Sequence, residues 1–154
     1  MSILGDDSGI IQETLRAKGV SIIHTLSSNV LNDTNTTDHH REVLEVQSPH
    51  LLIVAKLPVV PTPYDKKGRK RVRHLVTLVR QQMARGKHVI LLDSPRSQTW
   101  EVSELELLSQ DQNLTSLMAR WCSFGIQDDQ TKLNPSNITQ LLTSLQFSTP
   151  LDTC

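Results

Sequence analysis

The sequence predicts an α/β fold, a three-layer sandwich built around a short, mainly parallel β-sheet. Three apolar runs rich in β-branched residues carry this prediction, at residues 20–23, 51–55 and 88–92. Their apolar residues follow one another without alternation, which is typical of strands buried on both faces of a parallel sheet. Segments with helical spacing separate the runs, and this alternation indicates a sheet covered by helices on its two faces.

The composition indicates one domain. The chain has 154 residues, which is enough to bury a single core. We expect one Rossmann-like α/β domain over residues 1–147 and a frayed C-terminal tail over residues 148–154. Aromatic residues make up only 3% of the chain, so the core must consist mainly of Leu, Ile and Val.

Charge and hydropathy argue against several classes of partner. The formal net charge is zero, which removes any overall electrostatic attraction to a polyanion. No apolar run approaches the roughly 20 residues of a membrane span. The first residues lack the basic flank and apolar stretch of a secretion signal, and the two cysteines, Cys122 and Cys154, do not form a disulfide scaffold. We therefore expect an intracellular protein, cytoplasmic or nuclear, that does not associate with membranes.

The first 37 residues are expected to hold one helix and one strand. Apolar residues at 10–15 form a short helical face, and Gly19 is suited to end it. The strand at 20–23 follows directly, and the polar residues 29–37 predict a loop.

The segment from residue 38 to residue 86 carries the strongest helical pattern. Asp38 is expected to cap a helix that ends before Pro49, because the residue preceding a proline disfavours helical geometry. After the strand at 51–55, apolar residues recur at three- and four-residue steps over 72–83. Gly86 closes this run.

The remaining residues are expected to form a helix, a possible strand and a last helix. Ser103 with Glu106 fits a capping box that opens a helix. Residues 117–122 fit a strand or a helix almost equally well. An Asn-Pro pair at 134–135 then predicts the cap and first residue of a last helix, whose apolar face reaches Leu145.

A basic segment lies at the start of the best-patterned helix. Six cationic residues fall within eight positions: Lys66, Lys67, Arg69, Lys70, Arg71 and Arg73. The helix macrodipole disfavours cations at this end, so the charges must be solvated, screened or paired with an anion. Three interpretations stay open: a solvated loop, a nuclear-import signal, or a contact with the phosphates of DNA or RNA. Only Tyr64 adds an aromatic ring nearby, so stacking on unpaired bases is poorly supported.

Candidate ligand contacts follow the predicted strands, because open α/β sheets bind ligands at the carboxyl ends of their strands. Residues 56–63 follow the second apolar run and residues 93–96 follow the third. Within the latter, Asp93 either contacts a ligand or caps the following turn. Near the N-terminus, Gly5 and Gly9 bracket a turn that either binds a cofactor or is merely irregular.

Six short motifs occur in an order that is similar to one enzyme family. They are Gly5 and Gly9 before Gly19-Val20, the stretch Leu51 to Pro58, the stretch His88 to Pro95, the pair Thr99-Trp100, the element Cys122-Ser123-Phe124-Gly125, and the stretch Lys132 to Asn137. In this order they resemble a divergent methyltransferase-like Rossmann domain related to cytosine-C5 DNA methyltransferases, as found in mobile-element polyproteins. The resemblance covers most of the chain. It implies S-adenosylmethionine as the cofactor and a cofactor site that includes Gly5, Gly9, Pro58, Asp93 and Pro95.

Departures from the family pattern imply that the chemistry is lost. Cytosine-C5 transfer needs a thiolate that attacks C6 of the base, and Val59 stands where the resemblance places that thiol. Asp93 replaces a longer, Glu-type acidic residue. The acidic residue that would hold the cofactor ribose is missing around His24 and Thr25. The sequence thus predicts no catalytic residue.

We therefore expect a non-catalytic, methyltransferase-like domain of mobile-element origin, with residual binding of a nucleotide or nucleic acid. One alternative is a small nucleic-acid-binding or protein-interaction module that uses residues 66–73. Another is an unidentified enzyme on the same fold that uses Asp93. Metal binding is not expected, because the adjacent residues His39 and His40 point about 100° apart on a helix and no cysteine or carboxylate cluster lies nearby. The apolar context of Cys122 is more typical of a core residue than of a nucleophile.

Overall fold

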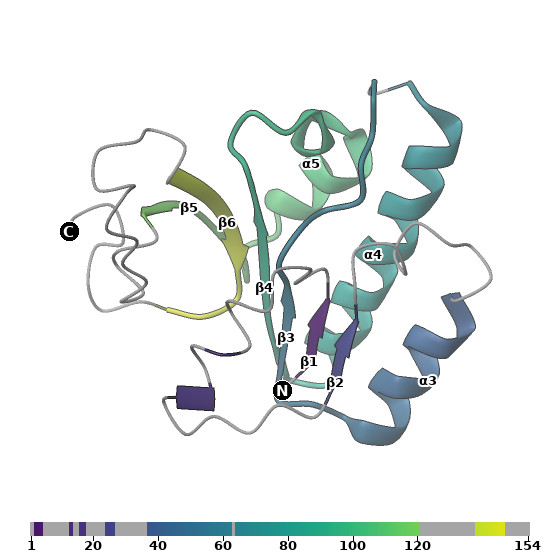
Figure 1. Cartoon of the computed structure of the whole chain (residues 1–154), viewed down its shortest axis with the longest axis vertical. Coiled ribbons are helices and arrows are strands. Elements are labelled where there is room, and N and C mark those ends of the chain that lie inside the picture. The colour runs from purple at the N-terminus through teal and green to yellow at the C-terminus, as the bar shows by residue number, and fades with distance from the viewer. Residues whose placement is uncertain are drawn as a thin grey trace.

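The computed structural model describes residues 2–4, 13, 16–17, 24–26, 37–62, 64–120 and 138–146 (Figure 1). These residues form a six-stranded sheet in the order β2-β1-β3-β4-β6-β5. The first four strands in this order run parallel, and β6 runs antiparallel to both of its neighbours. The structure confirms the predicted α/β fold with a short, mainly parallel sheet.

Four strands make up the parallel part of the sheet: β1 (Ser2–Leu4), β2 (His24–Leu26), β3 (Leu51–Val54) and β4 (His88–Asp93). β3 and β4 are adjacent, in a register that pairs Leu52 with Val89 and Val54 with Leu91. All four of these side chains are fully buried. The two longest apolar runs therefore form neighbouring, buried, parallel strands, as their unbroken apolar character predicts.

The N-terminal strands differ from the sequence prediction. β1 spans three residues, which are too few to show a hydrophobic period. β2 begins at His24, directly after the run predicted as a strand at 20–23, and that run lies outside the described residues. The tail at 148–154 also lies outside them, and of the predicted helix at 10–15 only residue 13 is described.

The prediction of a last helix through residue 145 is wrong. Residues 138–143 form the strand β6 (Ile138–Thr143), which pairs with β4 on one side and with β5 (Thr115–Arg120) on the other. Leu141 packs on one face of the sheet and Leu142 on the other. Because both faces are covered here, adjacent leucines are both buried, and this spacing imitates the apolar face of a helix. For residues 117–120 the strand interpretation is confirmed.

Two helices follow β2 and β3 along the chain, α3 (Thr37–Gln47) and α4 (Lys66–Ala84). α3 ends before Pro49 as predicted, but Asp38 is its second residue rather than its cap. The C-terminus of α4 also ends as predicted. Gly86 adopts a left-handed φ of 68°, and the backbone N–H groups of Gly86 and Lys87 donate to the carbonyls of Met83 and Gln82.

The predicted capping box at Ser103 is not formed. A short 3-10 helix, η2 (Gln98–Glu101), runs almost directly into α5 (Ser103–Ser109), so the buried residue Val102 occupies the N-cap position without a side-chain hydrogen bond. The Ser103 hydroxyl instead donates to the neighbouring Glu104 carboxylate, over 3.0 Å.

The core lies on both faces of the sheet. α3, α4 and α5 cover the same face (Figure 1). The larger cluster lies beneath these helices and combines residues such as Leu75 and Leu105 with Leu52 and Leu91 of the strands. A smaller cluster around Ile53, Leu92, Ala119 and Leu141 occupies the opposite face. A helical layer over that face would involve residues outside those described, so the three-layer arrangement stays a prediction. None of the helices in the described ranges is long and apolar enough to cross a membrane.

Candidate functional site

The carboxyl ends of β1, β3 and β4 lie at one edge of the sheet. β1 lies between β2 and β3, so the chain builds the sheet first to one side of β1 and then to the other. Open α/β sheets bind ligands at such a reversal of strand order. Leu4 pairs with Val54 at the ends of β1 and β3, and Asp93 ends β4. We call residues 55–60 after β3 and residues 93–100 at and after the end of β4 the carboxyl-edge site.

Two hydrogen bonds shape the loops of the carboxyl-edge site. The buried Thr99 hydroxyl donates to the Pro58 carbonyl over 2.9 Å and thereby holds the loop after β3 against η2. The Trp100 indole Nε1 donates to the Ser94 carbonyl over 3.0 Å and closes the loop after β4. A buried polar group left without its partner costs about 1–3 kcal/mol. The pair Thr99-Trp100 therefore has a structural role in positioning both loops.

Asp93 is the titratable group at the centre of this edge, and its side chain is partly buried. Burial raises its pKa above the ordinary value, although hydrogen bonds from the Ser97 side chain and the Ser94 backbone and the charge of Lys56 favour the ionised form. The Ser94 N–H lies 2.7 Å from its carboxylate oxygen. The Thr139 hydroxyl of β6 donates to the Asp93 carbonyl over 2.9 Å and so fixes the end of β4. Such a carboxyl group can accept hydrogen bonds from a ligand, or donate one when it is protonated.

Val59 presents its side chain to solvent at the same edge. It is 56% exposed, between the buried residues Pro58 and Val60. At the position where the resemblance implies a thiol, the site thus offers only methyl groups. Methyl groups neither attack a carbon atom nor transfer a proton.

The structure places three of the five predicted cofactor residues at this edge. Pro58 follows β3 and is buried, Asp93 ends β4, and Pro95 is exposed two residues later. Gly5 and Gly9 lie outside the described residues, although Gly5 directly follows β1 in the sequence.

The resemblance places the ribose-binding acidic residue just after a strand, near residues 24 and 25. His24 and Thr25 lie within β2, which ends at Leu26. The loop after this strand lies outside the described residues.

The basic segment forms the first two turns of α4, so its interpretation as a loop is wrong. The N-cap of this helix is Asp65, which the sequence pattern does not reveal. Its carboxylate accepts hydrogen bonds from the backbone N–H groups of Lys67 (3.2 Å) and Gly68 (2.9 Å). Lys66, Lys67 and Lys70 are exposed, and none of them forms an ion pair with any described residue. Arg71 is partly buried, and its Nε has no hydrogen-bond partner among the described residues.

Arg69 and Arg73 converge on Glu104 in the first turn of α5. Oε1 of Glu104 accepts hydrogen bonds from Arg69 Nη2 (3.0 Å) and Arg73 Nε (2.6 Å). Oε2 accepts from Arg69 Nε (3.4 Å) and from the Ser103 hydroxyl (3.0 Å). Desolvation raises the pKa of Glu104, but the hydrogen bonds from the two arginines outweigh it and lower the pKa to about 2. Asp65 and Glu104 together offset two of the six positive charges.

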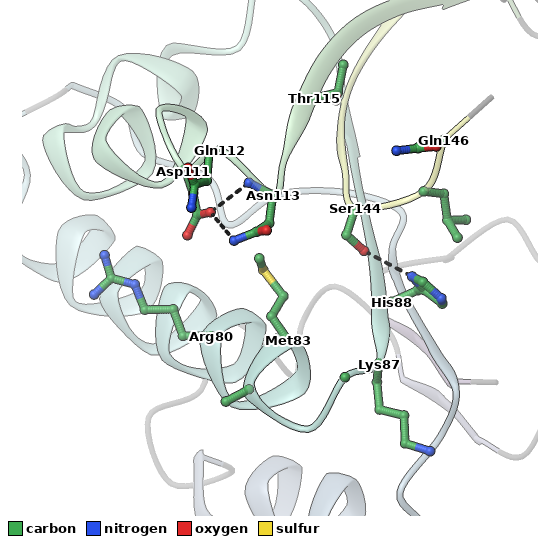
Figure 2. Close-up of a pocket in the computed structure, with 13 residues that line it drawn as sticks. Arg80, Met83, Lys87, His88, Asp111, Gln112, Asn113, Thr115, Ser144 and Gln146 are labelled. Atoms are coloured by element: carbon green, nitrogen blue, oxygen red, sulfur yellow. Dashed lines mark hydrogen bonds between the residues drawn. The ribbon is translucent and has the colours of Figure 1, made fainter. Parts of the chain in front are cut away.

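A groove of about 650 Å³ lies at the opposite edge of the sheet (Figure 2). Its walls come from the end of α4, the start of β4, the turn before β5 and the residues that follow β6. The sequence carries no signal for it, because these four segments share no motif. Ser144 and His88 face each other across 3.4 Å, but the Val89 N–H donates to the same Ser144 oxygen, and no described carboxylate contacts His88. The pair therefore lacks the arrangement of an activated nucleophile.

The described residues thus provide two candidate binding surfaces, the carboxyl-edge site and the basic face at the start of α4. Among the described residues, no three His, Cys, Asp or Glu side chains gather closely enough to hold a metal ion. In comparisons with known proteins, the chain matches no family model, no curated protein and no solved structure.

Proposed function

We propose that the chain is a non-catalytic, methyltransferase-like α/β domain of mobile-element origin that acts inside the cell, in the cytoplasm or the nucleus. The exposed Val59 at the carboxyl edge is the observation that carries this proposal. Two further features support it. The strand order reverses at β1, as in sheets that bind nucleotides, and Asp93 ends β4 where the resemblance implies an acidic residue.

The loss of methyl transfer follows from the chemistry of Val59. Attack on C6 of cytosine requires a thiolate, and a valine side chain has no lone pair. The remaining polar groups of the edge hold its loops together, as Thr99 does with Pro58. What the edge retains is the capacity to bind: a partly buried carboxyl group and backbone groups at the ends of parallel strands.

Transfer of labelled methyl groups from S-adenosylmethionine to cytosine in DNA tests this proposal. We expect no incorporation above the blank without protein. The Val59→Cys variant, with Val59→Ser as its matched control, should also remain inactive if the cofactor contacts are lost as well. Incorporation by the unmodified chain would contradict the proposal. A thermal shift with S-adenosylmethionine separately measures whether the edge still binds the cofactor.

A second candidate function is nucleic-acid binding through the start of α4. The exposed Lys66, Lys67 and Lys70, which lack ion pairs within the described residues, favour it. Cations that neutralise phosphates release counterions, so the affinity for duplex DNA should fall by about 0.9 logarithmic units per contact for each tenfold rise in salt. A titration at 50 and 200 mM salt tests this. An affinity that does not change with salt would contradict it.

A further inference from the structure

One face of α4 carries a row of four basic side chains. Lys66, Arg69, Lys70 and Arg73 are spaced by three and four residues, so they share a face of the helix. The row spans about 10 Å along the helix at 1.5 Å per residue. α5 meets this row at Glu104, and the row is therefore not simply exposed to solvent.

We propose that Arg69, Arg73 and Ser103 form a binding site for a nucleic-acid phosphate, which Glu104 fills in the free protein. This inference rests on the second proposed function, the contact of the basic segment with nucleic acid. It adds a defined phosphate site and an internal competitor for that site.

The geometry of the donors supports a phosphate. Two guanidinium groups surround one carboxylate, and Arg69 reaches both of its oxygens through Nη2 and Nε. Arg69 Nη2 also lies 3.2 Å from the Ser103 hydroxyl oxygen. A phosphodiester, like a carboxylate, carries one negative charge and offers two oxygens to such a fork of donors. The Glu104 carboxylate thus occupies the place that a phosphate would take.

The charge of the site favours exchange. One carboxylate faces two guanidinium groups, so one positive charge is left over, with Lys66 and Lys70 on the same helix face. The Arg73 side chain is 63% exposed, whereas that of Glu104 is 18% exposed. An incoming phosphate can therefore reach Arg73 first. An ion pair with so exposed a member as Arg73 is worth about 0–1 kcal/mol, so a phosphate can displace the carboxylate from this arginine at little cost.

Replacement of the Glu104 carboxylate by another anion, and not its protonation, frees the two arginines. The pKa of Glu104 is about 2, so the carboxylate stays ionised throughout the physiological range. Its oxygens leave the arginines only when another anion takes their place or when the side chain rotates away.

The Glu104→Gln variant of the full chain tests the proposal, and Glu106→Gln is its matched control. Glu106 is an exposed carboxylate on the same helix, so both variants change the net charge equally, but only the first removes the competitor. Binding of a mixed-sequence DNA duplex is measured at two salt concentrations. Glu104→Gln should bind about three- to fivefold more tightly than Glu106→Gln. Its log–log salt slope should steepen by up to about 1.8, or about 0.9 for each of two new contacts.

Other outcomes have distinct meanings. Equal affinities of the two variants would overturn the phosphate site and leave the basic segment as a general contact. No binding by the wild type or by either variant would overturn both the site and the second proposed function. Adding Arg69→Gln and Arg73→Gln to Glu104→Gln should remove the gain.

A measurement on the unmodified chain keeps the test independent of variants that fold poorly. The Nε–H resonance of Arg73, which is bonded to Glu104 in the free protein, should shift when duplex DNA is added. The Nε–H resonance of Arg120, in the edge strand β5, should stay in place. An Arg73 resonance that does not move during saturating binding would contradict the proposal.

Discussion

At position 104 a single carboxylate links α5 to α4, and the stability of this link depends on pH. The ordinary pKa of a glutamate is 4.5, and the folded protein lowers that of Glu104 to about 2. A lowered pKa in the folded state means that the ion pairs stabilise the fold fully above pH 4.5. Their contribution is lost as the pH falls toward 2.

Glu104→Gln should therefore lower the free energy of unfolding by about 1 kcal/mol at pH 7, a modest value because the Arg73 partner is largely exposed. Urea unfolding of both proteins at pH 7 and pH 3 measures the effect. The difference should shrink at pH 3. An equal difference at the two pH values would mean that packing, and not charge, explains the loss.

The pKa of Asp93 shifts in the opposite direction from that of Glu104. Burial raises its pKa, so ionisation of this carboxyl group opposes folding once the pH rises above the ordinary value of 3.8. Asp93→Asn removes the ionisation but keeps an oxygen that can accept the N–H of Ser94. The variant should match the wild type in stability at pH 3 and exceed it at pH 7. Chemical denaturation at both values checks this, and a variant less stable than the wild type at pH 7 would refute it.

At the scale of elements, the start of α4 depends on a close contact at Gly68. A Cβ atom there would lie 2.8 Å from Asp65 Oδ2 and 3.0 Å from both Cγ atoms of Val60. The first of these is the oxygen that caps the helix by accepting the Gly68 N–H. Glycine is therefore needed here for close approach, since its backbone is ordinary and helical.

Gly68→Ala should destabilise the protein even though alanine is the better helix former by about 1 kcal/mol. Displacing the Asp65 cap costs about 1 kcal/mol, and moving Val60 out of the core adds to it. We expect a net loss of about 1 kcal/mol in thermal or urea unfolding. Lys67→Ala, an exposed neighbour on the same helical turn, should change stability by less than about 0.5 kcal/mol. A stabilised Gly68→Ala variant would show that the contact relaxes freely.

The elements also show where sequence reasoning succeeds and where it fails. β3 and β4 are predictable because a strand buried on both faces is an unbroken apolar run. β6 is also buried, but Thr139 and Gln140 interrupt its apolar run, and Leu141 beside Leu142 then resembles a helix face. The end of α4 is predictable from Gly86. Its start is not, because the apolar pattern begins only at Val72, after the charged first turns.

Some residues of the candidate sites can likewise be predicted from the sequence, and others cannot. Asp93 is found because it directly follows a recognisable strand, and a local rule places such residues at the ligand edge. The ion pairs of Glu104 with Arg69 and Arg73 join residues 35 and 31 positions apart. No local pattern reports this contact, because it depends on how α5 packs against α4.

At the scale of the whole molecule, positive and negative charges balance, with 16 of each. Any attraction to nucleic acid must therefore come from where the cations lie and not from their total. The exposed lysines at the start of α4 provide such a concentration, while exposed arginines elsewhere are scattered. A contact with DNA depends on where each cation lies, because salt at 0.1 M screens interactions between exposed charges that are more than about 10 Å apart. Attraction through the overall field of the protein depends instead on the net charge.

Two triple variants of equal charge separate these effects. One replaces Lys66, Lys67 and Lys70 with Gln, and the other replaces the exposed arginines Arg80, Arg96 and Arg120 with Gln. Both lower the net charge by three. If the start of α4 contacts phosphates, the first variant should lose at least about tenfold in DNA affinity at low salt. Its log–log salt slope should weaken by about 0.9 for each lost contact.

The second variant should bind almost as the wild type does, since Arg96 and Arg120 lie outside α4 and Arg80 lies two turns beyond the end of the basic row. Neither set should impair folding, and the first should slightly stabilise α4, because cations at a helix N-terminus cost about 0.3–1 kcal/mol each at low salt. Equal losses of affinity in both variants would assign the binding to the field of the whole molecule. Unchanged affinity in both would leave the basic segment without a nucleic-acid contact, and a nuclear-import signal would then be the interpretation to test.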